Sequence, residues 1–241
     1  MEYAIIAAGE GSRLKEEGHT LPKPLLPLFG IPMIERLIGI FASQYAKRIH
    51  IIVNSQSQEL IDFLQEHDFK VPIVLYVKDT ESSLHSLYEL VKVNPQWNAI
   101  CVTTTDTVFS ERDFIDYLNA FTYHPRVDAY MGVTSFVDDE SPLYVGVNEY
   151  MEVEIFADSN TGEMTHVSGG IYGLRRKALD CVADSVASGN TRMRNYQRYL
   201  LEQQLEVRAH RFGKIVDVDH LKDRDAAEVF LAEIGEKPIQ Y

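Results

Sequence analysis

Runs of β-branched and other apolar residues alternate with amphipathic segments through the first half of the chain, and this alternation constrains the fold more than any other feature. The runs lie at residues 3–8, 48–53, 72–77 and 99–103. The segments between them carry apolar side chains at helical spacing, namely Ile34, Leu37, Ile38, Phe41 and Tyr45, and then Leu84, Leu87, Tyr88 and Val91. Strands that are apolar throughout are typical of a parallel sheet with helices on both faces. The pattern therefore predicts an α/β fold.

The second half of the chain has fewer helical segments and more strand-like ones. Strand-like stretches lie at residues 127–135, 143–147, 151–156 and 166–173, with turns expected at 138–139 and 160–162. A helical stretch over 175–203 and a strand–helix unit over 207–234 follow. We predict mixed or antiparallel strands added to one edge of the parallel sheet. Because neither a linker nor a repeat separates the halves, residues 1–241 are expected to form one domain, with halves of about 1–125 and 126–241.

The charge balance argues against nucleic acid as a partner. The chain has 23 Lys and Arg against 36 Asp and Glu, which gives a formal net charge of −13. A protein that follows a phosphate backbone needs the opposite sign. A small anionic ligand stays compatible with this charge, because a few basic side chains in one cleft set the local potential.

The cysteines and the hydropathy pattern indicate where the protein works. Cys101 and Cys181 form no CxxC pair and have no histidine at zinc-finger spacing, so neither a disulfide framework nor a structural zinc site is expected. No apolar run approaches the ~20 residues that a membrane-spanning helix needs. We therefore expect a cytoplasmic protein without a membrane partner, and leave a homo-oligomer open.

A glycine-containing loop follows the first run directly, and it matches neither of two common nucleotide-binding motifs. A dinucleotide fingerprint requires glycine or alanine at Leu14 and a helix that opens directly from the loop. The three prolines at 22, 24 and 27 are expected to prevent regular helix, so the next helix is predicted only near Pro32. A Walker loop is also excluded, because Lys23 lies far outside its frame.

What remains is a long irregular loop at the carboxyl end of the first strand, where open α/β sheets bind ligands. Gly9 and Gly11 allow the backbone amides to approach an anion closely. Arg13 offers a fork of donors to phosphate oxygens, and Lys23, held between prolines, offers a point charge. The loop is therefore a candidate phosphate-binding loop, with a solvated surface loop as the alternative.

Three segments of this region resemble the signature of the nucleotidyltransferases that make activated sugars and related compounds. They read Gly9-x-Gly11-Ser12-Arg13, Pro22-Lys23-Pro24-Leu25-Leu26 and Gly30-Ile31-Pro32-Met33-Ile34. The resemblance implies a Rossmann-like α/β/α sandwich of the nucleotide-diphospho-sugar transferase type, with a mixed, mostly parallel sheet. It also implies an enzyme that joins an NTP to a phosphorylated small-molecule acceptor, uses Mg²⁺ and releases pyrophosphate. The first half would then bind the nucleotide and the second half the acceptor.

The resemblance assigns residues to the nucleotide. Arg13 and Lys23 are the implied catalytic cations. The implied nucleotide-binding set is Ala8, Gly9, Gly11, Ser12, Arg13, Ser82, Ser83 and Thr105. Ser82 or Ser83 is independently a plausible N-cap of the helix over 84–91, which is the alternative role for these hydroxyls.

Three aspartates are candidate magnesium ligands, because Mg²⁺ prefers carboxylate oxygens. Asp106 follows the run at 99–103, and Asp217 and Asp219 alternate along a strand so that they share one face. The alternative is that each caps a turn or, for Asp219, the last helix. The resemblance supports Asp106 and Asp219, with Asp217 in reserve. It also marks a departure, because relatives often have Gly-Asp where this chain has Thr105-Asp106.

The implied acceptor site lies in the segment from Val167 to Gly173. Gly169, Gly170 and Tyr172 match a strand that lines the sugar-phosphate pocket in the family, although paired glycines also mark a simple bulge. A basic group follows, namely Arg175, Arg176, Arg192, Arg194 and Arg198. We assign Arg194 to the acceptor, with a solvated helix face as the alternative role for each arginine.

The family's Glu-Lys-Pro motif is absent, and no lysine lies between Lys92 and Lys177. The acceptor is therefore open between a sugar 1-phosphate and phosphocholine or another phosphorylated alcohol, the latter with a cytidylyltransferase activity. His85, His166 and His220 match no metal or nucleophile spacing and are expected to be structural.

The favoured hypothesis is an in-line attack of an acceptor phosphate oxygen on the α-phosphorus of the NTP. No covalent intermediate and no general base are needed, because the nucleophile is already an anion. The rival from another class is a nucleotide-binding module without transfer activity. A glycosyltransferase ranks last, since Thr104 stands where an Asp-x-Asp motif has its first carboxylate.

Overall fold

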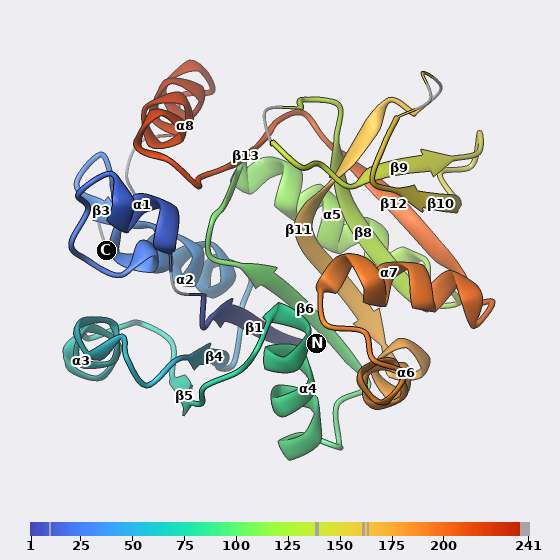
Figure 1. The fold of residues 1–241 in the computed structure, drawn as a ribbon, viewed down its shortest axis with the longest axis horizontal. Helices are drawn as coiled ribbons and strands as arrows, with labels where there is room; N and C mark the ends of the chain where they lie inside the picture. Colours follow the sequence, from blue (N-terminus) through green and yellow to red (C-terminus); the bar gives the residue numbers. More distant parts are fainter. Residues whose placement is uncertain (10, 138–139, 161, 163, 237–241) are drawn as a thin grey trace.

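The computed structural model describes residues 1–9, 11–137, 140–160, 162 and 164–236. Figure 1 shows a central sheet with helices on both sides. Its nine strands are β1 (Glu2–Ala7), β4 (Ile49–Val53), β5 (Ile73–Val77), β6 (Ala99–Thr104), β8 (Ala129–Thr134), β9 (Tyr144–Val147), β10 (Val153–Ala157), β11 (His166–Arg175) and β12 (Val207–Phe212). The expected turn at 138–139 lies outside the described residues, as does Thr161 of the turn expected at 160–162.

The first half of the sheet is parallel, as the apolar runs predict. β1 lies between β4 and β6, and Ile5 is paired with Ile51 on one side and Thr103 on the other. β5 extends the sheet beyond β4 in the same direction. Because these strands are parallel, their carboxyl ends meet at one edge of the sheet, and that edge carries the candidate site.

Helices cover both faces of the sheet. On one face, α2 (Met33–Ser43), α3 (Gln58–Glu66) and α5 (Glu111–Tyr123) form one core cluster with strand residues such as Ile5 and Ile51. On the other face, α4 (Ser83–Val93), α6 (Arg176–Ala187) and α7 (Met193–Glu202) pack on Ala4, Ile6 and Val102. Alternate residues of β1 thus enter opposite cores, as the pleat of a strand requires. The result is the expected three-layer α/β/α arrangement.

The second half of the chain adds the mixed strands that its pattern predicts. β11 is antiparallel to β6 and β8, β9 and β10 form an antiparallel pair, and β12 is parallel to β8. The helical stretch expected over 175–203 is present, but it consists of two separate helices, α6 and α7. Gly189 lies between them with φ +87°, a left-handed conformation that ends a helix and that glycine adopts without strain.

The expectation that no helix opens from the glycine loop is also wrong. Helix α1 (Ser12–Glu16) begins directly after Gly11, which has a φ of +61°. The prolines do limit regular structure further on, where a 3₁₀ turn spans Lys23–Leu25 and a short hairpin joins β2 (Pro27–Leu28) to β3 (Ile31–Pro32). Leu14 of α1 is buried, which explains why the short helix forms without a cap.

A segment near the C-terminus, residues 215–233, packs on residues 14–33 near the N-terminus. Strand β13 (Ile215–Asp217) is antiparallel to β7 (Thr107–Phe109), and α8 (Leu221–Glu233) follows it. Figure 1 shows α8 above α1 at the same side of the molecule. A third core cluster joins them, with Leu14, Leu26, Leu28, Met33, Val108, Val216, Val218, Ala227, Phe230 and Leu231. This packing carries the acidic residues of the C-terminal segment to the glycine loop.

Among the helices that the structure describes, none combines the length and the apolar character needed to cross a membrane.

Candidate active site

The glycine loop lies at the carboxyl end of β1 and is held close to Lys23. A Cβ atom added at Gly11 would lie 2.9 Å from the Cβ atom of Lys23, closer than two carbons pack. The start of the loop is held by the residue after β4, because Asn54 Nδ2 donates a 3.0 Å hydrogen bond to the Ala8 carbonyl oxygen. Glycine at position 11 therefore lets the loop turn tightly and lets Lys23 pack directly against it.

Lys23 reaches two of the three predicted metal-binding aspartates. Its Nζ atom lies 2.9 Å from Asp106 Oδ2 and 2.6 Å from Asp219 Oδ1. The lysine side chain is only 11% exposed, against 28% for each aspartate. The flanking prolines restrict the backbone here, so the ammonium group is held at the cluster with little freedom.

Burial and mutual attraction act in opposite directions on the pKa values of Lys23 and Asp106. Burial alone would lower the pKa of Lys23, but the negative charges of Asp106, Asp217 and Asp219 raise it above its ordinary value. Burial would likewise raise the pKa of Asp106, but Lys23 and a hydrogen bond from Thr104 lower it. Both groups are therefore charged at neutral pH.

Asp106, Asp217 and Asp219 form an acidic cluster in which one carboxylate oxygen from each lies within 4.8 Å of the others. Asp106 lies in the turn between β6 and β7, and its carbonyl oxygen accepts a 3.0 Å bond from the Val218 amide. The predicted shared strand face holds only in part, because β13 ends at Asp217 and Asp219 lies beyond it. The cluster forms nevertheless, since the pairing of β13 with β7 sets Asp217 opposite Thr107.

The alternative role of Asp219 as a helix cap is not the one that the structure gives it. The N-cap of α8 is His220, which forms a capping box with Asp223. The Asp219 carboxylate instead pairs with Lys23 and with the guanidinium of Arg13. Asp219 therefore joins the acidic cluster to the two cations of the glycine loop.

Two cavities meet at the acidic cluster. The first, which we call the loop cavity, has a volume of about 410 Å³. Its lining includes all eight residues predicted to bind the nucleotide, together with Lys23, Asp106 and Asp219. The second, the arginine cavity, has a volume of about 430 Å³, and its lining includes Gly169, Gly170, Tyr172, Arg194 and Asp217. Four residues line both cavities, namely Ser82, Ser83, Thr104 and Asp106.

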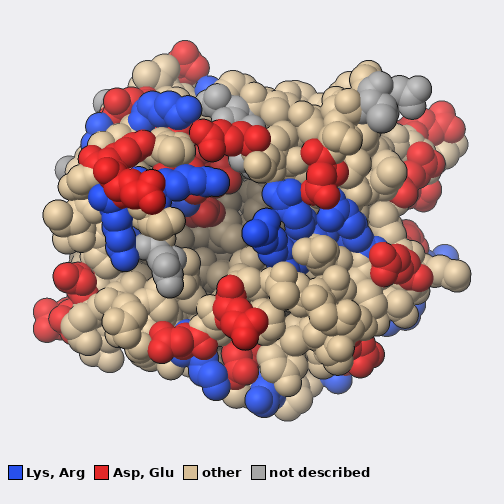
Figure 2. Space-filling model, viewed as in Figure 1, with Lys and Arg blue, Asp and Glu red and all other residues tan. Residues whose placement is uncertain are grey.

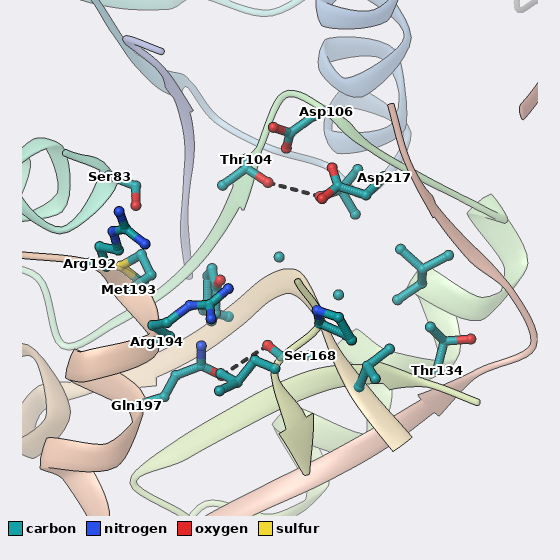
Figure 3. Close-up of a pocket in the computed structure, with 18 of the residues that line it drawn as sticks. Ser83, Thr104, Asp106, Thr134, Ser168, Arg192, Met193, Arg194, Gln197 and Asp217 are labelled. Atoms are coloured by element: carbon teal, nitrogen blue, oxygen red, sulfur yellow. Dashed lines mark hydrogen bonds between the residues drawn. The ribbon is translucent and has the colours of Figure 1, made fainter. Parts of the chain in front are cut away.

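The paired glycines of β11 let this strand approach β7. A Cβ atom at Gly170 would lie 2.5 Å from Thr107 Oγ1 and 2.7 Å from Thr104 Oγ1, and φ there is +72°. The strand also has an irregular register between Ser168 and Tyr172, so the bulge considered as an alternative is present too. Ser168 Oγ donates a 2.9 Å hydrogen bond to Gln197 Oε1 across the arginine cavity. Figure 3 shows this pair in the cavity, opposite Asp106.

The basic group of the second half does not gather at one place. Arg175 stacks on Phe121 with its Cζ 4.1 Å from the ring centre, and Arg176 pairs with Asp180. Arg194 and Arg198 share Asp158 at 2.8 and 2.7 Å. Figure 2 shows basic side chains over α7 beside the central hollow of this face.

The histidines have the structural surroundings expected of them. His85 Nδ1 lies 3.0 Å from Ser82 Oγ, and Ser82 is the N-cap of α4 that the sequence suggested. His166 is buried in β11, and His220 caps α8.

Several cavity residues were not predicted. They are Thr80, Ser86, Thr104, Thr107, Thr134, Phe136 and Gln197. The run of threonines at 103–105 was a usable signal for Thr104, because hydroxyls are unusual at the end of a buried strand. Gln197 gave none, since it occupies one helical position among many.

Comparison with known proteins places this arrangement among nucleotide-using enzymes. The family of MobA-like NTP transferase domains matches residues 3–158. The bifunctional protein GlmU of Methanococcus aeolicus is 22% identical over 184 residues, which are 75% of this chain and 41% of GlmU. The 2-aminoethylphosphonate cytidylyltransferase of Lancefieldella rimae is 30% identical over 132 residues, 53% of this chain and 49% of that protein. The chain thus spans less than half the length of either relative.

A solved structure covers nearly the whole chain. The inositol-1-phosphate CTP transferase from T. maritima superposes with a TM-score of 0.81 at 15% sequence identity. The superposition covers 98% of this chain and 96% of that one. It confirms the predicted Rossmann-like fold with a mixed, mostly parallel sheet.

Proposed function

Because this chain belongs to the family of MobA-like NTP transferase domains, we propose that it is a nucleotidyltransferase that joins an NTP to a sugar 1-phosphate. The observation that carries the proposal is the pair of cavities that meet at Asp106. A transfer between two bound substrates needs adjoining sites with the reacting groups at the boundary. The loop cavity would hold the NTP and the arginine cavity the acceptor.

The charges of the loop cavity fit a triphosphate. Arg13, Lys23 and the amides around Gly9 and Gly11 supply positive charge at the carboxyl end of β1. In the proposed reaction, an oxygen of the acceptor phosphate forms a bond to the α-phosphorus of the NTP. The bond from the α-phosphorus to the bridging oxygen breaks, and pyrophosphate leaves with the electron pair. The entering oxygen is already anionic, so no residue has to remove a proton.

Arg13 and Lys23 act in this proposal by holding the phosphates and balancing charge that builds on the leaving group. Groups that are preorganised in this way contribute most of the rate enhancement in phosphoryl transfer. Ser82 and Ser83, at the start of α4, line both cavities and are placed to bind polar groups of either substrate.

The acidic cluster fits a magnesium ion. Asp106, Asp217 and Asp219 offer three hard oxygen ligands, and Asp106 lines both cavities. Bound Mg²⁺ would neutralise phosphate charge and orient the triphosphate. Lys23 and Arg13 pair with the same carboxylates, so the cluster already attracts cations.

The polar lining of the arginine cavity supports a sugar as the acceptor. Ser168, Gln197 and Thr134 present hydroxyl and amide groups, which match the hydroxyl groups of a sugar. A second candidate is a cytidylyltransferase that acts on phosphocholine or a similar small phosphorylated or phosphonylated alcohol. The 30% identity to an enzyme named for 2-aminoethylphosphonate favours this candidate.

Pyrophosphate release tests both candidates. Purified protein with Mg²⁺ is incubated with each of ATP, CTP, GTP, UTP and dTTP, crossed with a pool of sugar 1-phosphates and a pool of phosphocholine and related compounds. Release with one NTP and the sugar pool supports the first proposal, and release with CTP and the second pool supports the alternative. Nucleotide binding without release from any combination would contradict both and favour a binding module.

We also infer a cytoplasmic setting for the reaction. Its support is that Cys101 and Cys181 are both free thiols.

A further inference from the structure

The arginine cavity has a marked division of charge. Its described lining includes two carboxylates, Asp106 and Asp217, and two cations, Arg192 and Arg194. Tyr172 also lines this cavity, where burial and the charges of Asp106 and Asp217 raise its pKa and Arg194 opposes the rise. Any phosphorylated acceptor in this cavity therefore has only two arginines of the described lining to offset its charge.

One of the two arginines already has an anionic partner. Arg194 Nη1 lies 2.8 Å from Asp158 Oδ1, and its Nη2 donates a 2.8 Å hydrogen bond to the Ser141 carbonyl oxygen. These contacts join α7 to the end of β10 and to the segment before β9. Asp158, which Arg194 shares with Arg198, and the Ser141 carbonyl oxygen thus hold the Arg194 side chain in the cavity wall.

Arg192, the other arginine, has no anionic partner among the described residues. Within the part of the chain that the structure describes, the Arg192 side chain forms no hydrogen bond or ion pair. It precedes the first residue of α7, a helix with neither a side-chain cap nor an acidic residue in its first turn. The start of this helix therefore adds a partial positive charge beside the guanidinium.

The position of Arg192 is the boundary of the two cavities. Ser82, which lines both cavities, donates a hydrogen bond to the carbonyl oxygen of Thr191, the residue before Arg192. Figure 3 shows the Arg192 guanidinium directed toward Ser83, another residue shared by both cavities. A phosphate that approaches the α-phosphorus of a nucleotide in the loop cavity must cross this boundary.

We propose that Arg192 binds the phosphate or phosphonate group of the acceptor and aligns it for transfer, and that Arg194 only positions the cavity wall. This inference rests on the proposed function. A guanidinium suits the task, because its planar fork donates two parallel hydrogen bonds to a phosphate and fixes its orientation. Arg192 thus serves the acceptor, while Arg13 and Lys23 serve the triphosphate.

Steady-state kinetics of three variants tests the proposal. Arg192→Ala is expected to raise the KM for the acceptor about 10- to 100-fold, as for the loss of a hydrogen-bonded charge pair, with the KM for the NTP within about threefold. Arg192→Lys should recover part of this loss. Arg198→Ala is the matched control, because it removes a guanidinium close by in sequence, together with that side chain's contact to Asp158, but Arg198 does not line the cavity. The control should keep the acceptor KM within about threefold of the wild-type value. An acceptor KM unchanged in Arg192→Ala, or an equal rise in both KM values, would overturn the proposal.

A binding measurement separates this proposal from the proposed function. Calorimetry follows inorganic phosphate binding to protein that is saturated with a non-hydrolysable nucleotide analogue, so that the loop cavity is already filled. We expect phosphate to bind to the wild type and to Arg198→Ala, and about tenfold more weakly to Arg192→Ala. Equal binding, or none, in the wild type and Arg192→Ala would reject the role of Arg192 even if pyrophosphate is released. Conversely, a loss of phosphate binding in Arg192→Ala would uphold that role in a protein that releases no pyrophosphate.

Discussion

The Lys23 Nζ atom lies 2.6 Å from Asp219 Oδ1 in the acidic cluster, although the two residues are 196 positions apart in the sequence. The lysine ammonium thus lies where a divalent cation would take its carboxylate ligands. A metal ion at the proposed site would therefore compete with Lys23 for Asp106 and Asp219, unless the triphosphate drew the lysine away.

This competition predicts that removal of the lysine strengthens metal binding in the absence of nucleotide. Lys23→Met leaves three carboxylates within 4.8 Å of one another without their buried counter-ion, so their affinity for a divalent cation should rise by about tenfold or more. Titration with Mn²⁺, followed by electron paramagnetic resonance, measures the free ion directly. Lys15→Met, on the exposed side of α1, is the matched control. Metal affinity that falls or is unchanged in Lys23→Met would contradict the competition.

The same substitution should have the opposite effect on turnover. If Lys23 balances charge on the triphosphate in the transition state, its loss should cost about 3 to 4 kcal/mol, or roughly 10²- to 10³-fold in kcat, as for other preorganised donors. Pyrophosphate release at saturating substrates measures this cost. Turnover of Lys23→Met within threefold of the wild type would remove the lysine from the mechanism.

Asp106 is expected to matter more than the other aspartates, because it alone of the three lines both cavities. Asp106→Asn keeps the shape of the side chain but removes its charge, and we expect turnover to fall at least about 100-fold. Nucleotide binding measured without a metal should persist, since Arg13 and Lys23 remain. Asp180→Asn, on α6, serves as the control for removal of an exposed charge. Turnover close to that of the wild type in Asp106→Asn would assign the metal to Asp217 and Asp219.

The tight approach of β11 to β7 predicts a stability effect at Gly170. Alanine there would have a φ of +72° and a Cβ atom 2.5 Å from Thr107 Oγ1. We expect Gly170→Ala to lower the free energy of unfolding by about 2 to 4 kcal/mol, because strain and steric overlap add. Gly189→Ala separates the two, since φ there is +87° but nothing lies within 4 Å of the added atom. Its expected cost is about 1 kcal/mol from strain alone. Equal midpoints in urea unfolding for the two variants would contradict the overlap.

Much of this site follows from the sequence because its residues lie at strand ends. Parallel strands bring their carboxyl ends to one edge, so Gly9 and Asp106 were expected to meet once the apolar runs were recognised as strands. The resemblance then supplied Asp219, which no local pattern connects to Lys23. Arg194 and Arg192 show the limit of sequence reasoning. The two arginines lie two positions apart and have similar neighbours in the sequence. Only the packing of α7 on β10 brings Asp158 next to Arg194.

The sequence pattern also did not predict helix α1 or the separation of α6 from α7. α1 forms because Leu14 is buried against the C-terminal segment, a contact between residues about 200 positions apart that no local window contains. The helical stretch over 175–203 divides near Gly189, a break that the sequence analysis did not predict. Tertiary packing thus favours α1, while the local conformation of Gly189 separates α6 from α7.

Two buried histidines and one half-buried histidine predict how the stability of the fold depends on pH. Burial lowers the pKa of His50, His166 and His210 below the ordinary value of 6.5, which Glu2 opposes at His50 and Asp116 and Asp113 oppose at His210. The unfolded chain therefore binds more protons than the folded chain between about pH 5 and 7, and the free energy of unfolding should rise with pH across this window. Paired carboxylates such as Asp106 act in the same direction but at lower pH, because their folded-state pKa is also depressed, so the two effects separate. Urea unfolding at pH 5, 6 and 7 measures the slope. His210→Gln should make the slope shallower than in the wild type. A stability that is flat or falls between pH 5 and 7 would show that these rings are protonated inside the fold.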